Sequence, residues 1–367
     1  MLKLKDIAHN VTKITRKQSD LWLLPEQLVA LEVEVENFRQ APRQKDIRDS
    51  LRDFWTVEDD GSLRNNGAEL VSGPQYGRDL LAALSVLEQA LPQNVVWSLR
   101  TSVHVHLDVR EWTTDQLLSM IYMYIVLEYV LFEFSPHRRN NQYCVPWFCS
   151  GANDIAGVLH ILRQRQSAVA LKEALSALYR YSALNLKAVH KFATVEFRHM
   201  HGTNNAMELV SWINILMGLI KAGDNPSQFI LAQLKTQESA IVLLRYIYGP
   251  YYKLLEETED YSYNINQGLK SLQNILFMLE EHYEKQENNA PVQVNKESSY
   301  ALFRKKKIVQ QKDELEEEEL PEAPRVWFDE QEEEDNDGGD NRDEDEAIRE
   351  EEDRDNDGDD NDEGNGD

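Results

Sequence analysis

Cysteine is scarce in this chain of 367 residues: Cys144 and Cys149 are the only two. Two thiols cannot cross-link a chain of this size, so a disulfide scaffold is excluded and a reducing compartment, the cytoplasm, is expected. The pair also falls short of the four ligands of a usual structural zinc site, and two buried thiols are the simpler interpretation. The first residues, Met-Leu-Lys-Leu-Lys-Asp, contain no apolar run, so no secretory signal is expected.

Long uncharged apolar runs are missing as well. The most apolar stretch, Thr114–Phe134, carries Asp115, Glu128 and Glu133, which leave 12 uncharged residues in a row, Gln116–Leu127. A membrane-spanning helix needs about 20 such residues. The stretch therefore predicts a buried helix, and no membrane association is expected.

Glycine-rich phosphate loops are absent too. Neither GxxxxGK[ST] nor GxGxxG occurs, and no GxSxG nucleophile motif is present. A phosphate-containing ligand would therefore have to be held by metal ions and arginines.

Negative charge is abundant, but only at one end of the chain. Residues 311–367 hold 30 Asp and Glu against 5 Lys and Arg, whereas residues 1–310 hold 35 and 34. A segment this polar cannot bury enough apolar surface to fold, so residues 287–367 are expected to form a disordered acidic tail. The tail could contact a basic protein partner or simply keep the protein soluble. The remaining residues, 1–286, suit one large domain.

Three distant segments alternate apolar and ionisable residues: 31–36 (LEVEVE), 103–108 (VHVHLD) and 194–198 (TVEFR). Alternation with period two is typical of half-buried strands, because successive side chains point to opposite faces. The ionisable faces would carry Glu32, Glu34, Glu36, His104, His106, Asp108, Glu196 and Arg198. Such a concentration of carboxylates and imidazoles predicts a sheet that lines a metal and anion site.

The side chains in these segments favour particular ligands. Carboxylates with an occasional imidazole suit Mg²⁺ or Mn²⁺, and Glu69, in a further expected strand, could join Glu32, Glu34 and Glu196. Glutamates exposed on an edge strand are the alternative, which we favour only for Glu36 at the strand end. Arg198, in the middle of a strand, would either pair with Glu196 or bind a phosphate.

The remaining pattern predicts an α+β fold. Strands are expected over 29–38, 67–73, 95–108 and 188–199, and helices over 76–91, 114–134 and 168–181. A loop rich in special residues fills 136–154. The C-terminal part is expected to be helical near 205–221, 227–234 and 264–284. The sheet would be curved and mainly antiparallel, with helices packed on its outer side.

The motifs in this order resemble the amidoligase family of carboxylate–amine ligases, which is related to glutamine synthetase and glutamate–cysteine ligase and is often encoded by phages. The resemblance covers about residues 28–205 and rests on these segments: Glu32-Val-Glu34, Gly67–Pro74, Ser102–His106, Arg138–Cys144, Ala183–Leu186, Thr194–Arg198 and Gly202-Thr203. One departure is visible, since Ala30-Leu31 stands where the family usually places glycine before the first acid. No ligand residue is lost by it.

The resemblance implies a role for each matched residue. The metal ligands would be Glu32, Glu34, Glu69, His104 and Glu196. ATP would be bound by His104, His106, Arg198 and Asn185, and the catalytic residues would be Arg198, Glu196 and Arg139. The implied cofactors are ATP and Mg²⁺ (or Mn²⁺), and the implied reaction is phosphorylation of a carboxylate followed by attack of an amine on the acyl phosphate.

The implied partners are a small-molecule or peptide carboxylate and an amine, with no nucleic acid bound. The protein would act in the cytoplasm, that of the host if the chain is phage-encoded. Two other functions stay open: a metal-dependent phosphohydrolase that uses the same acids, and a non-catalytic interaction protein that acts through its acidic tail.

Overall fold

A computed structural model describes residues 21–38, 44–91, 95–149, 152–164 and 168–287. These residues belong to one compact unit, residues 1–314, whereas the second unit, residues 315–367, lies outside the described part of the chain. The predicted disordered tail, 287–367, therefore also lies outside the described residues, apart from Glu287, which ends the last helix.

The described strands form one six-stranded sheet in which every neighbouring pair is antiparallel. The strands lie in the order β2 (Trp55–Glu58), β3 (Ala68–Ser72), β1 (Val29–Val35), β4 (Ser102–Asp108), β6 (Thr194–His201) and β5 (Leu184–Asn185). The three segments with strict alternation thus become adjacent strands β1, β4 and β6 in the middle of the sheet. The predicted α+β class and the antiparallel sheet are confirmed.

Helices make up most of the rest. They are α1 (Gln44–Leu51), α2 (Gly77–Ala90), α3 (Thr114–Leu131), α4 (Ala152–Gln164), α5 (Ala168–Ala177), α6 (Lys187–Phe192), α7 (Ala206–Ala222), α8 (Ser227–Gln233), α9 (Gln237–Tyr248), α10 (Tyr252–Glu256) and α11 (Tyr261–Glu287). Short 3₁₀ helices occupy η3 (Phe132–Phe134), η4 (Pro136–Asn140), η5 (Trp147–Cys149) and η6 (Gly249–Tyr251). The C-terminal half is helical, as predicted, and contains α9 and α10 in addition to the expected segments.

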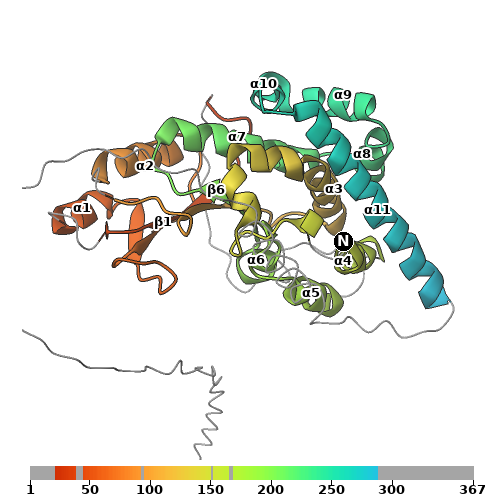
Figure 1. Ribbon diagram of the computed structural model, residues 1–367, viewed down its shortest axis with the longest axis horizontal. Coiled ribbons are helices and arrows are strands. Elements are labelled where there is room, and N and C mark those ends of the chain that lie inside the picture. Colours follow the sequence, from red (N-terminus) through yellow and green to blue (C-terminus); the bar gives the residue numbers. More distant parts are fainter. Residues whose placement is uncertain (1–20, 39–43, 92–94, 150–151, 165–167, 288–367) are drawn as a thin grey trace, which may run out of the picture. The chain divides into compact units, whose positions relative to one another are not determined.

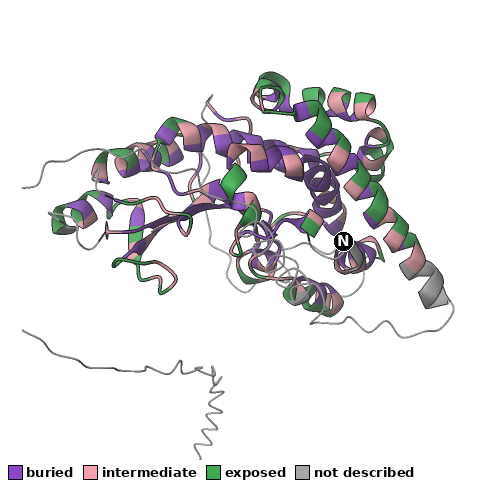
Figure 2. Ribbon diagram, viewed as in Figure 1, coloured by how far each residue is buried: buried purple, intermediate pink, exposed green. Residues whose placement is uncertain are grey.

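The apolar sides of the alternating strands form the centre of the core. Leu31, Val33, Val105 and Phe197 have no exposed surface. Helices α2 and α7 lie along this side of the sheet (Figure 1), and Figure 2 shows that the strands and the faces of α3 and α7 are largely buried. The polar sides of β1, β4 and β6 consequently face away from this layer.

Helix α3 is the buried helix predicted from the sequence. Thr113 begins it with a capping box, in which its hydroxyl accepts a hydrogen bond from Gln116 N and the Gln116 side chain accepts one from Thr113 N. The segment Thr114–Phe134 is long and apolar enough to cross a membrane, as is the bent pair formed by α7 and α8. However, 83% of the α3 window is buried inside the fold, which is the environment of a core helix.

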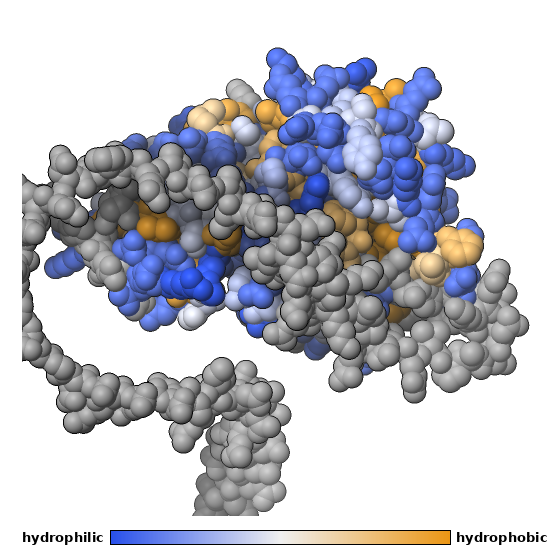
Figure 3. All heavy atoms as spheres, viewed as in Figure 1, coloured by the Kyte–Doolittle hydropathy of each residue, from blue (hydrophilic) through white to orange (hydrophobic). Residues whose placement is uncertain are grey.

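Helix α11 packs against α3 and α4. Gly268 makes the contact with α3 possible, because a Cβ at this position would lie 2.0 Å from the carbonyl oxygen of Val126. The outward faces of α9 and α10 are mostly hydrophilic (Figure 3), although single apolar side chains such as Val242 are exposed there.

Two strands begin well after the positions expected from the sequence. The strand predicted over 95–108 begins only at Ser102, because Thr101 and Ser98 form a turn in which Thr101 N and Oγ1 both bond to Ser98 O. The strand predicted over 188–199 begins at Thr194. Its first half is helix α6, which ends at Ala193 in the left-handed conformation.

The loop expected over 136–154 contains more structure than predicted. It holds η4 and η5, and α4 begins within it at Ala152. The helix expected over 168–181 ends at Ala177. The chain turns there to enter β5, which has only two residues.

Candidate active site

The polar sides of β1, β3, β4 and β6 share one face of the sheet, and their register sets ionisable residues opposite each other. Glu32 lies opposite His104, Glu34 opposite Glu69, and His106 opposite Glu196. Side chains opposite each other on neighbouring antiparallel strands are within contact distance. Residues separated by up to 164 positions in the chain therefore meet on one surface.

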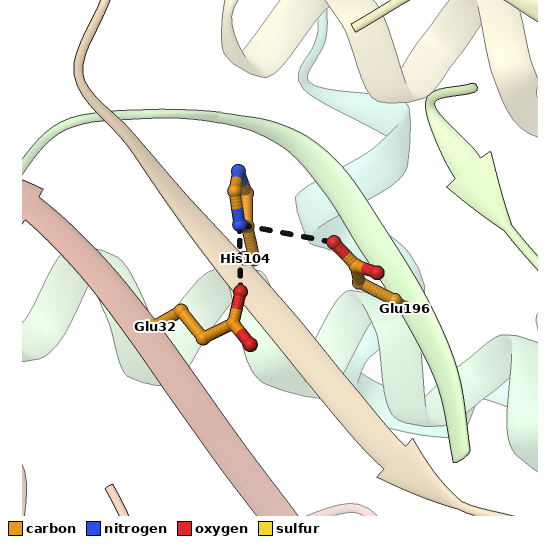
Figure 4. Close-up of side chains that lie close together, drawn as sticks. All are labelled: Glu32, His104 and Glu196. Atoms are coloured by element: carbon orange, nitrogen blue, oxygen red, sulfur yellow. Dashed lines mark hydrogen bonds and ion pairs between the residues drawn. The ribbon is translucent and has the colours of Figure 1, made fainter. Parts of the chain in front are cut away.

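His104 lies at the centre of this group and is almost completely buried. Its Nδ1 is 3.0 Å from Glu32 Oε2 and 3.7 Å from Glu196 Oε1 (Figure 4), and its Nε2 is 3.8 Å from Glu34 Oε1. One imidazole thus faces carboxylates from two neighbouring strands, β1 and β6.

Among the described residues, two groups of side chains could each hold a metal ion, and they share His104. The first is Glu32, His104 and Glu196; the second is Glu34, Glu69 and His104; in each, the donor atoms lie within 4.8 Å of one another. Carboxylate oxygens with one imidazole nitrogen are a donor set for Mg²⁺ or Mn²⁺. The residues present therefore fit the metal that the sequence led us to expect.

Ser102 joins the two halves of the cluster and was missed in the sequence. Its hydroxyl donates to Glu34 Oε2 at 2.5 Å and lies 2.8 Å from His104 Nε2. The sequence contained the information needed to find it. Ser102 is two residues before His104 in the same strand, β4, so its side chain points to the same face as those of His104 and His106.

His106 holds the other carboxylate oxygen of Glu32. Its Nε2 is 3.2 Å from Glu32 Oε1, and its Nδ1 is 3.0 Å from the hydroxyl oxygen of Thr194. Burial lowers the pKa of His106, but the contact with Glu32 and the charges of Glu196 and Glu32 outweigh burial and raise it. The cationic form of the ring is therefore favoured beside Glu32.

The carboxylates differ in how readily they ionise. Burial raises the pKa of Glu32, but hydrogen bonding to His104 and His106 lowers it well below its usual range. Burial raises the pKa of Glu196, but the charges of Arg198, His106 and His104 together lower it. Glu69 differs, because burial, followed by the charges of Glu32 and other nearby carboxylates, raises its pKa to about 8.

Arg198 is paired with Glu196 in this structure. Its Nη1 donates to Glu196 Oε1 and lies 3.4 Å from His104 Nδ1, and its Nε donates to the carbonyl oxygen of Tyr143 at 3.2 Å. Burial lowers the pKa of Arg198, but Glu196 raises it, so the guanidinium stays charged. Of the two alternatives that the sequence left open for Arg198, the structure shows the pair with Glu196.

Asn185 also reaches the cluster, but through Glu196. Its Nδ2 donates to Glu196 Oε2 at 2.6 Å, and its Oδ1 accepts the backbone N–H of Lys187. The amide therefore orients an acid of the site and begins helix α6 at the same time.

Arg139, expected among the catalytic residues, contacts residues outside the cluster around His104. Its Nη2 donates to Glu133 Oε1 at 2.9 Å and to the carbonyl oxygen of Tyr129 at 3.3 Å, and its guanidinium lies against the Tyr129 and Phe148 rings. In the tight 3₁₀ turn η4, adjacent side chains point in different directions, so two successive arginines cannot be told apart from the sequence.

The neighbouring Arg138 turns toward the site instead and is completely buried. Its Nη2 donates to the carbonyl oxygen of Arg198 at 3.1 Å. Arg198 N–H pairs with Ala183 O just before β5 begins, and its carbonyl points to the same edge, where Arg138 takes the place of a strand partner. Burial lowers the pKa of Arg138, and the charge of Glu34 offsets this only in part.

Glu36 and Asp108 have local roles. Glu36, directly after β1, is buried; its backbone pairs with Val96, and its Oε1 accepts the backbone N–H of Arg64. Asp108 pairs with Arg110 Nε at 2.8 Å. Neither side chain belongs to the two groups that can hold a metal.

A family model described as "Putative amidoligase enzyme" matches residues 9–220. This range contains all strands of the described sheet and every residue of the two groups around His104. The search of curated proteins found no match. Because the match covers more than half of the chain and includes the whole candidate site, the protein belongs to the amidoligase family.

Proposed function

We propose that the protein is an ATP-dependent ligase that joins a carboxylate to an amine as an amide or isopeptide bond. The observation that supports this most directly is the pair of carboxylate groups sharing His104, with Arg198 beside them. The family match supports ligase activity in general. The nucleotide, the acyl-phosphate route and the substrates are part of the proposal.

The metal would be Mg²⁺ or Mn²⁺, held by Glu32, Glu34, Glu69, His104 and Glu196. Such an ion neutralises negative charge on a phosphoryl group during transfer. Several ionised carboxylates close together repel each other unless cations are present. His106 and Arg198 supply part of this compensation within the protein, and the remaining negative charge favours binding of a divalent cation.

Each residue of the site would then act on the reacting groups. Arg198 would stabilise charge on the oxygens of the phosphoryl group during its transfer to the carboxylate, while Glu196 and Tyr143 O fix its guanidinium in direction. Asn185 would keep Glu196 oriented, and His106 would hold Glu32. Arg139 has no place in this scheme.

The test compares Glu32→Gln with Glu173→Gln, a matched control on the exposed face of α5. With ATP, Mg²⁺ and a pool of acids and amines, we expect Glu32→Gln to lower ADP formation by about 100-fold or more, the scale of one lost transition-state contact. The control should behave like the wild type. Mass spectrometry of the products distinguishes a ligase, which forms an amine adduct, from a phosphohydrolase, which releases only phosphate.

Equal ADP formation in wild type and Glu32→Gln would refute the assignment of Glu32 to the metal site.

The substrates proposed are a small-molecule or peptide carboxylate and an amine, and the cytoplasm is the proposed compartment. A basic protein partner for the acidic tail stays a separate proposal, because the tail lies outside the described residues.

A further inference from the structure

Ser102 places a buried hydroxyl between the two candidate metal groups. Its Oγ lies 2.5 Å from Glu34 Oε2 and 2.8 Å from His104 Nε2, and the side chain is almost completely buried. Both distances are those of good hydrogen bonds. Because buried polar groups must satisfy each other, the way in which these three groups share their hydrogens is set by the fold.

The directions of the two hydrogen bonds follow from what each group can donate. A hydroxyl carries a single hydrogen, and Ser102 donates it to the Glu34 carboxylate. Toward His104 the Ser102 oxygen can then only accept, so His104 Nε2 must carry a hydrogen. A ring nitrogen whose hydrogen is held in this way has no lone pair with which to bind a metal ion.

The other ring nitrogen of His104, Nδ1, faces the first metal group. It lies 3.0 Å from Glu32 Oε2 and 3.7 Å from Glu196 Oε1 (Figure 4). Arg198 Nη1, which can only donate, lies 3.4 Å from Nδ1, so a lone pair on Nδ1 also suits this neighbour. A divalent cation can therefore take the place of a hydrogen between Nδ1 and the two carboxylates.

We infer that Ser102 is a positioning residue that makes Nδ1 the metal-binding nitrogen of His104. The inference rests on the metal site of the proposed function and narrows it. His104 completes the group with Glu32 and Glu196, whereas the second group keeps only its two carboxylates as ligands. Metal-binding histidines almost always donate their second ring N–H to a nearby oxygen, and loss of that partner lowers metal affinity about 10–100-fold.

The test is pulsed EPR of Mn²⁺ bound to the full chain, in which histidine carries ¹⁵N either at Nδ1 only or at Nε2 only. A nitrogen bound directly to Mn²⁺ couples to its electron spin, so the two labels show which ring nitrogen is the ligand. The growth of this signal with Mn²⁺ concentration gives the affinity. No histidine follows His282, so ions held by the acidic residues 311–367 give no such signal.

The variant is Ser102→Ala, and Ser119→Ala is the control. Ser119 is also buried, and its hydroxyl contacts the carbonyl oxygens of Asp115 and Asn225, outside both metal groups. We expect the wild type and the control to show coupling to Nδ1 and equal affinity. Ser102→Ala should bind Mn²⁺ about tenfold or more weakly. Its Nδ1 coupling should be lost or shared with Nε2, because the ring can then carry its hydrogen on either nitrogen.

Three results would overturn the inference: coupling to Nε2 in the wild type, coupling to neither nitrogen, or Nδ1 coupling with affinity within twofold of the wild type in Ser102→Ala. The first two are measured on the wild type alone and do not depend on the variant. Failure of the proposed function is distinguishable. If no acid and amine yield ADP, yet Nδ1 coupling is present and depends on Ser102, the role of Ser102 stands and the ligase assignment fails.

Discussion

Glu128 is a buried carboxylate that binds the loop containing Tyr143, Trp147 and Phe148, and its titration predicts how stability depends on pH. Its oxygens accept hydrogen bonds from Trp147 N at 2.6 Å, Phe148 N at 2.9 Å and the Tyr124 hydroxyl at 2.5 Å. The same loop carries Tyr143, whose carbonyl accepts Arg198 Nε. Glu128 thus ties helix α3 to the segment whose Tyr143 carbonyl contacts Arg198.

The protonation of Glu128 should make stability depend on pH. Burial raises its pKa to about 7, although the three hydrogen-bond donors act in the opposite direction, whereas the ordinary value is 4.5. The folded state therefore binds the proton more tightly than the unfolded state. The resulting stabilisation is fully present below pH 4.5 and is lost as the pH rises to 7, with a total of roughly 3 kcal/mol.

The variant Glu128→Gln cannot ionise, so its stability lacks this contribution. Its amide nitrogen also faces one of the backbone N–H groups, which costs about 1–3 kcal/mol at all pH values. We expect wild type to exceed the variant in free energy of unfolding most strongly near pH 4.5. This difference should shrink by roughly 3 kcal/mol by pH 8.

Urea denaturation of both proteins between pH 4.5 and 8.5 measures the difference directly, since other titrating groups are common to both and cancel. Glu173→Gln, on the exposed face of α5, is the control and should show no such trend. A difference between wild type and Glu128→Gln that stays constant across the pH range would refute the reasoning. It would mean that the three donors, and not burial, decide the charge of Glu128.

Two further predictions each compare the same substitution at two positions: Arg138 and Arg139, and then Gly268 and Gly157. Arg138→Met removes the donor to the Arg198 carbonyl and should abolish most ADP formation, while Arg139→Met should retain it; equal turnover in both variants would contradict the positioning role. Loss of the buried charge offsets loss of the hydrogen bond, so the urea midpoint of Arg138→Met should move little. Gly268→Ala should destabilise the protein by about 1–3 kcal/mol, because its Cβ would meet the α3 backbone. Gly157→Ala, in the middle of α4 with open space around it, should stabilise the protein by about 0.5–1 kcal/mol, and thermal unfolding of both checks the contrast.

The sequence determined which side chains share a face, and the reason is local. In an extended chain the side-chain period is two, so Glu32 and Glu34, or His104 and His106, must point the same way wherever the strand lies. A helix over the apolar run was also predictable from local sequence, but the run is apolar enough to cross a membrane, and its burial in the fold is what identifies it as a core helix. These features depend on residues only a few positions apart.

The tertiary structure alone decided what those faces meet. The register that sets Glu32 opposite His104, and the turn that directs Arg138 and not Arg139 to the Arg198 carbonyl, depend on contacts between distant segments. The start of β6 was also predicted too early, because residues 187–192 form helix α6. The first backbone N–H of this helix, that of Lys187, donates to the Asn185 side chain, which in turn donates to Glu196. Pairing across tens of residues is a property of the packed sheet, and no local pattern in the chain encodes it.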